Sequence, residues 1–208
     1  AQLSNETELL NVSSSCPDTI CDYISLHKLS SLLSLRATVT FSNHYTAHGT
    51  AAQQAQWIVD PHREIIGWNA GAFAPQYVQL DLNQKHTIYC IRLHVEQCPP
   101  GETIHHILVG ADKNHLEMVR EFNFTTLRGD RLVHTFIPPY DNVRYIQIKT
   151  LQSPSWVAWI NVQVYGASMK HSFNISVYQH YRLDSQLSLI TPALLLFLAI
   201  ITEISAGY

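Results

Sequence analysis

The chain has 208 residues, of which 46% are hydrophobic and 14% are charged, and its formal net charge is −3. This length suits one domain with extensions or two small domains, and the hydrophobic content is sufficient for one core. A small negative net charge provides no global basic field for nucleic acid, so we expect no nucleic-acid partner.

Residues 1–35 form an N-terminal extension that begins polar and then becomes amphipathic. Its leucines Leu26, Leu29, Leu32 and Leu33 recur at a helix-like spacing. A helix and a coil that lays these leucines on the following domain are equal alternatives here. The chain starts at Ala1, which is compatible with removal of a signal peptide.

Short runs of alternating hydrophobic and polar residues dominate residues 37–166. Ile91, Leu93 and Val95 share one face of such a run, and Arg92 and His94 share the other. The expected strands lie at residues 39–41, 77–82, 88–95, 103–109, 116–122, 132–137, 143–148 and 157–165. Turns are expected at residues 83–84, 99–101, 112–114, 128–130, 138–139 and 153–154. Short strands with frequent turns, and no strand–helix–strand alternation, predict an all-β sandwich or barrel.

The C-terminal part changes character again, with a linker at residues 167–185 and an apolar segment at residues 186–208. Residues 186–202 contain no charged side chain. As a helix this run spans about 25 Å, slightly less than the ~30 Å hydrocarbon core of a bilayer. We expect a helical segment whose first interpretation is a membrane anchor. A cleaved lipid-anchor signal and a buried core helix remain alternatives.

Four Asn-x-Ser/Thr sequons indicate export and predict N-glycosylation at Asn5, Asn11, Asn123 and Asn174. Exported chains with an even number of cysteines commonly form disulfides, and this chain has four: Cys16, Cys21, Cys90 and Cys98. The alternation places Cys90 on the outward face of its strand, and Cys98 lies too far along a straight strand to bond with it. We therefore hypothesise two disulfides that join Cys90 and Cys98 to Cys16 and Cys21 and tie the extension across the sheet.

The stretch of residues 67–82 contains Trp68, a polar loop and a strand that ends in Asp81-Leu82. This pattern resembles the discoidin family, the coagulation factor five/eight type C domains. The runs at residues 88–95, 143–150, 153–159 and 162–166 resemble later strands of that family in the same order. The resemblance covers about residues 36–166.

The resemblance implies an antiparallel jelly-roll sandwich of the galactose-binding-like kind, with ligand-binding loops at one end. Such modules bind glycans, phospholipid headgroups or proteins, and a glycan or glycoprotein is the first expected partner. We therefore expect a non-catalytic recognition module outside the cell or at the cell surface, with possible attachment to a membrane through residues 186–202. The alternative is a structural or adhesion subunit of an extracellular or membrane-associated assembly.

By the same resemblance, candidate ligand-binding side chains lie on loops at the binding end. Aromatic faces can stack on sugar rings while polar groups read hydroxyls. The candidates, together with the neighbouring Glu96, are Asn43, His44, Tyr45, Trp68, Asn69, Phe73, Gln97 and Trp156. For Trp68 and Trp156, packing in the core or at an edge is the competing interpretation.

Some family members hold a structural calcium ion, but only Asp60 matches the acidic loop here, and Asn161 stands where the closing strand would often supply a glutamate. A hard cation takes six to eight oxygen ligands. We therefore expect no calcium and no other cofactor, with Asp60 as the one ligand to test. Because adjacent strand residues face opposite sides, His105 and His106 are not expected to share a metal.

Two further patterns concern activity and adhesion. The sequence contains neither Gly-x-Ser-x-Gly nor His-Glu-x-x-His, and no residues remain for a separate catalytic domain, so we expect no enzymatic activity and no catalytic residues. The tripeptide Arg128-Gly129-Asp130 spells an integrin-type motif, but a turn that needs glycine is the better interpretation.

Overall fold

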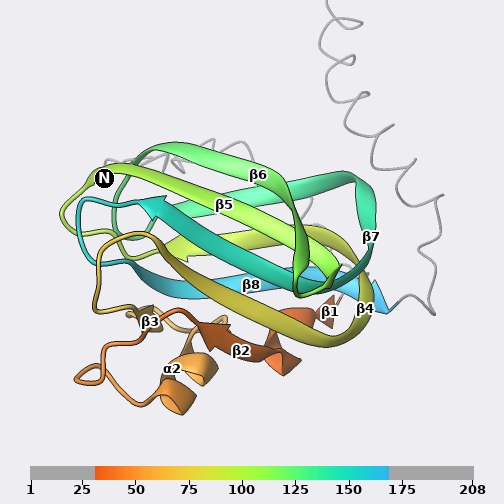
Figure 1. Cartoon of the computed structure of the whole chain (residues 1–208), viewed down its shortest axis with the longest axis horizontal. Helices are drawn as coiled ribbons and strands as arrows, with labels where there is room; N and C mark the ends of the chain where they lie inside the picture. Colours follow the sequence, from red (N-terminus) through yellow and green to blue (C-terminus); the bar gives the residue numbers. More distant parts are fainter. Residues whose placement is uncertain (1–30, 169–208) are drawn as a thin grey trace, which may run out of the picture. The chain divides into compact units, whose positions relative to one another are not determined.

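The computed structural model of the protein describes residues 31–168, and every structural statement below concerns this part of the chain. Strands dominate it, with one short α-helix and one 3₁₀ helix (Figure 1). The elements are β1 (Ser31–Leu32), η1 (Leu33–Arg36), β2 (Thr38–Phe41), α2 (Ala51–Trp57), β3 (Trp68–Asn69), β4 (Gln76–Val95), β5 (Gly101–Asp112), β6 (His115–Thr126), β7 (Arg131–Gln152) and β8 (Ala158–Ser168).

Two layers arise because β4 and β7 are long enough to belong to both. The first half of β4 pairs with β2 and with the second half of β7, which continues to β5 and β6. The second half of β4 pairs with the first half of β7 and with β8, whose other edge carries β1 and β3. All these pairings are antiparallel, which confirms the predicted antiparallel all-β fold.

The core lies between the layers and follows the period of two that the sequence shows. Val78, Leu80 and Leu82 of β4 are buried, while the residues between them are partly exposed. From the other layer, β8 contributes Val162 and Val164 to the same hydrophobic cluster. Burial of one face of each strand therefore fixes which face carries the polar side chains.

Two predicted turns are wrong because β4 and β7 continue through them. Asn83 adopts a positive φ of 68° inside β4, where the pairing register shifts between Asp81 and His86. Its amide Nδ2 donates to the carbonyl oxygen of Arg36 at 2.7 Å. The Pro138-Pro139 pair likewise lies inside β7, beside another register shift. Each site is an irregularity that bends a strand from one layer to the next rather than a chain reversal.

The helix α2 was not expected from the strand-like pattern around it. Its first turn carries a capping box, in which the Thr50 side chain accepts from the Gln53 backbone and the Gln53 side chain accepts from the Thr50 backbone. Within the predicted N-terminal extension, Leu32 and Leu33 pack on the domain from β1 and η1. The other leucines of that pattern, Leu26 and Leu29, lie outside the described residues.

The cysteines behave differently from the predicted pair of disulfides. Cys90 is disulfide-bonded and buried, but Cys98 is an exposed free thiol, so the prediction for Cys98 is wrong. Cys98 lies in the β4–β5 loop, beyond the end of the strand that carries Cys90, so the two cysteines do not share one face of the sheet. Cys16 and Cys21 lie outside the described residues.

Several other predictions fall on residues that the structure does not describe. They are the sequons at Asn5, Asn11 and Asn174, the apolar segment, and the predicted linker beyond Ser168. The first two linker residues, Ala167 and Ser168, belong instead to β8 because they pair with Thr87 and His86 of β4. Of the four sequon asparagines, Asn123 is described, and it is exposed on β6. No helix within residues 31–168 is long and apolar enough to cross a membrane.

Candidate functional site

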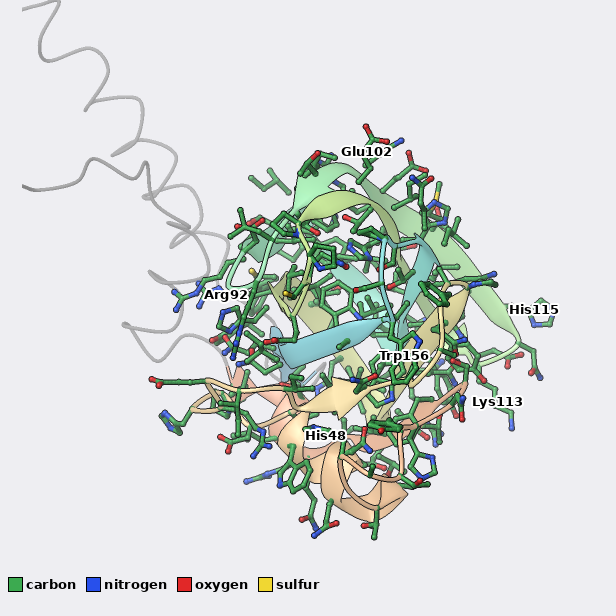
Figure 2. The ribbon with its side chains drawn as sticks, turned by 90° about the vertical axis from the view of Figure 1, so that its left-hand side faces the viewer. His48, Arg92, Glu102, Lys113, His115 and Trp156 are labelled. Carbon is green, nitrogen blue, oxygen red and sulfur yellow. The ribbon has the colours of Figure 1, made fainter. Side chains whose placement is uncertain are left out.

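A cleft of about 420 Å³ opens where four segments meet at one end of the sandwich. These segments are the residues before β3, the β3–β4 loop, the β4–β5 loop and the β7–β8 loop. Figure 2 faces this end, with Trp156 near the centre of the view. We call this the loop-end cleft, and it is lined by Ile66, Asn69, Phe73, Glu96, Cys98, Pro154, Ser155, Trp156 and Ala158.

Exposed aromatic side chains flank the loop-end cleft. Phe73 is 60% exposed and Trp156 is 42% exposed, although both are large apolar groups. Tyr45 meets Trp156 edge-on, with ring centroids 5.3 Å apart. The cleft therefore offers aromatic faces, and the Tyr45 contact restrains the orientation of the Trp156 ring.

Backbone hydrogen bonds hold the aromatic loops together. The N–H of Val157 donates to the carbonyl of Ala72 at 3.0 Å, and the N–H of Ala70 donates to that of Val157 at 2.9 Å. Gly71 between them has a φ of +65°, and a Cβ there would lie 3.0 Å from the Cβ of Tyr45. A side chain at this position would therefore strain the loop and press on the aromatic cluster.

The predicted ligand residue Gln97 does not line the cleft but supports the loops that form it. It is almost fully buried, and its amide nitrogen donates to the carbonyl of Pro99 and to Ser155 Oγ at 2.8 Å. Its amide oxygen accepts from Ser153 Oγ at 2.9 Å. Gln97 thus ties the β4–β5 loop to the β7–β8 loop, and it is buried beneath the cleft lining rather than part of it.

Gln54 of α2 also joins separate segments beside the cleft through side-chain hydrogen bonds. The sequence analysis did not identify this residue. Its Nε2 donates to the carbonyls of Tyr45 and Gly49, each at 2.9 Å. Its Oε1 accepts from the backbone N–H of Asn69 at 3.1 Å. The capping-box spacing of Thr50 and Gln53 was the available signal for the helix, but nothing in the sequence indicated the three partners of Gln54.

The cleft also contains a carboxylate that is shielded from water. Glu96 is 8% exposed, and its Oε1 pairs with Nε of Arg128 at 3.1 Å. Burial raises the pKa of Glu96, and the charge and hydrogen bond of Arg128 oppose that shift. Its Oε2 has no hydrogen-bond partner among the described residues. The cleft thus contains a carboxyl group that accepts a proton at a higher pH than a solvated glutamate does.

The structure separates the remaining predicted ligand residues from this cleft. Trp68 is fully buried in the core, and its Nε1 donates to the carbonyl of Asn43 at 2.9 Å. The core interpretation of Trp68 is therefore correct and the ligand interpretation wrong. Asn43 and His44 line a different hollow, between β2 and α2. Tyr45, Asn69, Phe73 and Trp156 are the predicted residues that the fold brings together.

The predicted metal ligand Asp60 acts in a turn. Its Oδ1 accepts from the backbone N–H of His62 at 2.9 Å. Asn161 donates from its amide to the carbonyl of Arg63 at 3.1 Å. Within residues 31–168, no three His, Cys, Asp or Glu side chains are grouped closely enough to hold a metal ion.

The His105-His106 pair and the Arg128-Gly129-Asp130 tripeptide both have local structural roles. His105 is buried, with Nδ1 3.0 Å from Thr150 Oγ1, whereas His106 faces the other way and pairs with Glu121 at 2.8 Å. The opposite orientation of the two histidines is thus confirmed. The Arg128-Gly129-Asp130 tripeptide forms the β6–β7 turn, and Gly129 has the positive φ of 95° that favours glycine.

Comparison with solved structures identifies the architecture. A family 32 carbohydrate-binding module from Clostridium perfringens, solved with galactose, is similar with a TM-score of 0.53 and 15% identity, over 65% of this chain and 98% of that one. A fucolectin from striped bass, Morone saxatilis, has a TM-score of 0.54 and 17% identity, over 66% of this chain and 49% of that one.

An F5/8 type C domain from Bacteroides fragilis has a TM-score of 0.50 and 18% identity, over 67% of this chain and 97% of that one. No family model matches the sequence, and no curated protein matches it. At these identities the likeness is one of fold, and it confirms the predicted galactose-binding-like sandwich.

Proposed function

We propose that this chain, which has the galactose-binding-like sandwich fold of the discoidin domains, is a non-catalytic module that recognises glycans through the loop-end cleft. The observation that carries the proposal is the pair of exposed aromatic rings, Phe73 and Trp156, beside polar groups in one cleft. Exposed aromatic groups gathered in a concave site mark binding surfaces more often than isolated ones do.

The chemistry of the cleft suits a sugar ring. The apolar face of a pyranose stacks on an aromatic ring, and its hydroxyls require acceptors and donors at the edge of that contact. Asn69, Glu96 and Ser155 supply such groups from three different segments. Because one of the similar folds was solved with galactose, galactose is the first ligand to test.

We further propose that the protein acts outside the cell or at its surface. The disulfide at Cys90 supports this proposal, since disulfides persist in oxidising compartments. The exposed sequon at Asn123 supports it as well. The apolar residues 186–202 are the proposed membrane attachment, and they lie outside the described residues.

The test is a glycan array followed by affinity measurement with purified wild-type protein and two variants. Trp156→Ala is expected to weaken binding at least about tenfold, which corresponds to about 1.4 kcal/mol. Ile137→Ala is the matched control, because Ile137 is a large apolar side chain that is 63% exposed but lies on β7 outside the cleft. Its affinity should equal that of the wild type.

Two results would contradict the proposal. One is a folded protein that binds no glycan on the array while it binds liposomes, which would indicate a phospholipid ligand. The other is a Trp156→Ala variant with wild-type affinity, which would place the glycan elsewhere on the domain.

The alternative function, a subunit of a larger assembly, has one observation in its favour. An open groove of about 800 Å³ runs between β6 and the first half of β7, and the exposed side chains of Met118 and Ile137 lie along it. Native mass measurement distinguishes the two functions, because a monomer at working concentration argues against the assembly.

A further inference from the structure

The face of β4 and β8 that is turned away from the main core has unusual properties. Register pairs Cys90 with Tyr165, Arg92 with Gln163, and His94 with Asn161 along this face. We call it the outer β4–β8 face. A sheet face directed away from the core is ordinarily solvated, yet all of Cys90, Tyr165, Gln163 and Asn161 are buried.

The disulfide at Cys90 limits which segment of the chain can supply its partner cysteine. Within residues 31–168 the other cysteine is Cys98, and it is free. The sequence contains two more cysteines, Cys16 and Cys21. An intramolecular partner for Cys90 must therefore come from residues 1–30.

Chain length permits this connection. The described part starts in β1, where Leu32 pairs with Tyr165, and Tyr165 pairs in turn with Cys90. Two strand spacings of about 4.8 Å separate Leu32 from Cys90. The nine residues between Cys21 and Ser31 can span about 30 Å when extended, so either cysteine can reach.

Charge complements this geometry. A cavity of about 410 Å³ on the outer β4–β8 face is lined by Arg63, Arg92 and Arg131, with Glu64 as the one carboxylate among its lining residues. Residues 1–30 have the opposite balance, with four carboxylates and one lysine: Glu6, Glu8, Asp18, Asp22 and Lys28.

The positions of the two aspartates fit the arginines. Asp18 follows Cys16 by two residues, and Asp22 directly follows Cys21. Arg92 lies two residues from Cys90 along β4, a distance of about 7 Å. Whichever cysteine bonds to Cys90, an aspartate next to it is within reach of an arginine. Such charge-assisted pairs are stronger than neutral hydrogen bonds when partly buried.

We propose that residues 16–30 of this chain dock on the outer β4–β8 face, held by a disulfide from Cys90 to Cys16 or Cys21 and by aspartate–arginine pairs. Formation of the bond removes two protons and two electrons from the two thiols, and a disulfide oxidant accepts them and becomes a dithiol. The docked segment is an intramolecular cover of a basic face. It is independent of glycan recognition, because Arg92 lies at the left edge of the sandwich in Figure 2, away from Trp156.

Peptide mapping of unreduced, alkylated full-length protein tests the covalent part. Trypsin separates Cys90 from Cys98 by cleavage after Arg92, and a protease that cleaves before aspartate separates Cys16 from Cys21 at Asp18. The expected result is a cross-linked peptide of Cys90 with Cys16 or Cys21, with Cys98 alkylated. A Cys90–Cys98 link, an alkylated Cys90, a Cys16–Cys21 link or a disulfide between two chains would each overturn the proposal.

Hydrogen exchange of residues 16–30 tests the docking itself. Arg131→Glu keeps the disulfide but reverses one charge of the face, and Cys90→Ala removes the bond. Both variants should raise the exchange of this segment at least several-fold. Arg120→Glu is the matched control, because Arg120 is an exposed arginine on β6.

Equal exchange in the wild type, Arg131→Glu and Arg120→Glu would overturn the docking even if the disulfide is found. Arg131→Glu keeps the test decisive if Cys90→Ala does not fold. Glycan binding is measured in parallel for the wild type and for these three variants, all of which retain Trp156. If none of them binds glycan, the result counts against the proposed function and not against the docking.

Discussion

At the scale of single residues, His105 is an imidazole enclosed in the core. Its Nδ1 is hydrogen-bonded to Thr150, and its ring meets Trp159 edge-on at 4.7 Å. Burial lowers its pKa from 6.5 to about 4, and the nearby His106 adds to that shift. The folded protein therefore holds His105 in its neutral form over a range in which the unfolded chain binds a proton.

This difference predicts a pH dependence of stability. His105 contributes about 3 kcal/mol to the free energy of unfolding above pH 6.5. This contribution is lost as the pH falls from 6.5 toward 4. His105→Asn retains an acceptor for Thr150 but does not titrate. Urea unfolding between pH 7 and pH 4 should therefore show a shallower loss of stability for this variant. His115→Asn, at an exposed position, should keep the wild-type dependence, and parallel curves for His105→Asn and wild type would contradict the argument.

The two tryptophans singled out in the sequence show what residue type alone can predict. Both Trp68 and Trp156 suit a core or a binding site equally well. Trp68 is buried because β3 pairs with β8 through the Trp68–Trp159 register, which turns its ring into the sandwich. Trp156 stays exposed because the β7–β8 loop carries it past the end of the sheet. The decision between the two roles depends on strand pairing, which a single sequence does not contain.

At the scale of elements, the short helix α2 places two parts of the site. Gln54 projects from it to the Tyr45 loop and to Asn69 of β3, so one side chain joins three segments. A seven-residue helix is marginal by itself. Its place therefore depends on the capping box and on these contacts.

Replacement of Gln54 by leucine preserves volume and removes all three hydrogen bonds. The free energy of unfolding should fall by about 2–4 kcal/mol, because backbone groups of Tyr45, Gly49 and Asn69 lose their partner. Affinity for glycan should fall as well, since Tyr45 supports Trp156. Gln56→Leu is the control on an exposed position of the same helix. Denaturation and calorimetric titration measure both effects, and equal values for the two variants would refute the positioning role.

Strand positions were predictable where the period of two was clean, and strand lengths were not. The runs at residues 77–82 and 88–95 are both parts of β4. Their alternation matches the observed burial at residues 77–82 and 91–95, whereas residues 88–91 are all buried. Asn83 and Gln84 have the composition of a turn, but β7 pairs with β4 on both sides of the bend, and β2 pairs with β4 before it. Local composition signals an irregularity, and only the pairing partners decide between a bend and a reversal.

At the scale of the whole molecule, the loop-end cleft exists because the layered fold brings four distant segments to one end. Ile66, Glu96 and Trp156 are separated by tens of residues, yet all line the cleft. The resemblance of residues 36–166 to the discoidin family predicted a loop-end site. It did not distinguish the residues that line or flank the loop-end cleft from Trp68, Gln97, Asn43 and His44.

The domain as a whole is expected to function without calcium. Asp60 caps a turn, and Asn161 donates its amide to a carbonyl. A calcium ion would require several additional oxygen ligands at this place. Chelation with EDTA should therefore leave both the melting temperature and the glycan affinity unchanged, and added calcium should have no effect. A fall in melting temperature on chelation that calcium reverses would show that the ion is bound.

The sequence by itself determined the fold class and most strand faces, because alternation records which side of each strand is buried. It also determined the aromatic and polar residue types from which a site could be built. Tertiary structure alone decided the free state of Cys98, the burial of Trp68, the continuity of β4 and β7, and the positioning role of Gln54. These features depend on contacts between residues far apart in the chain, and local periodicity carries no information about such contacts.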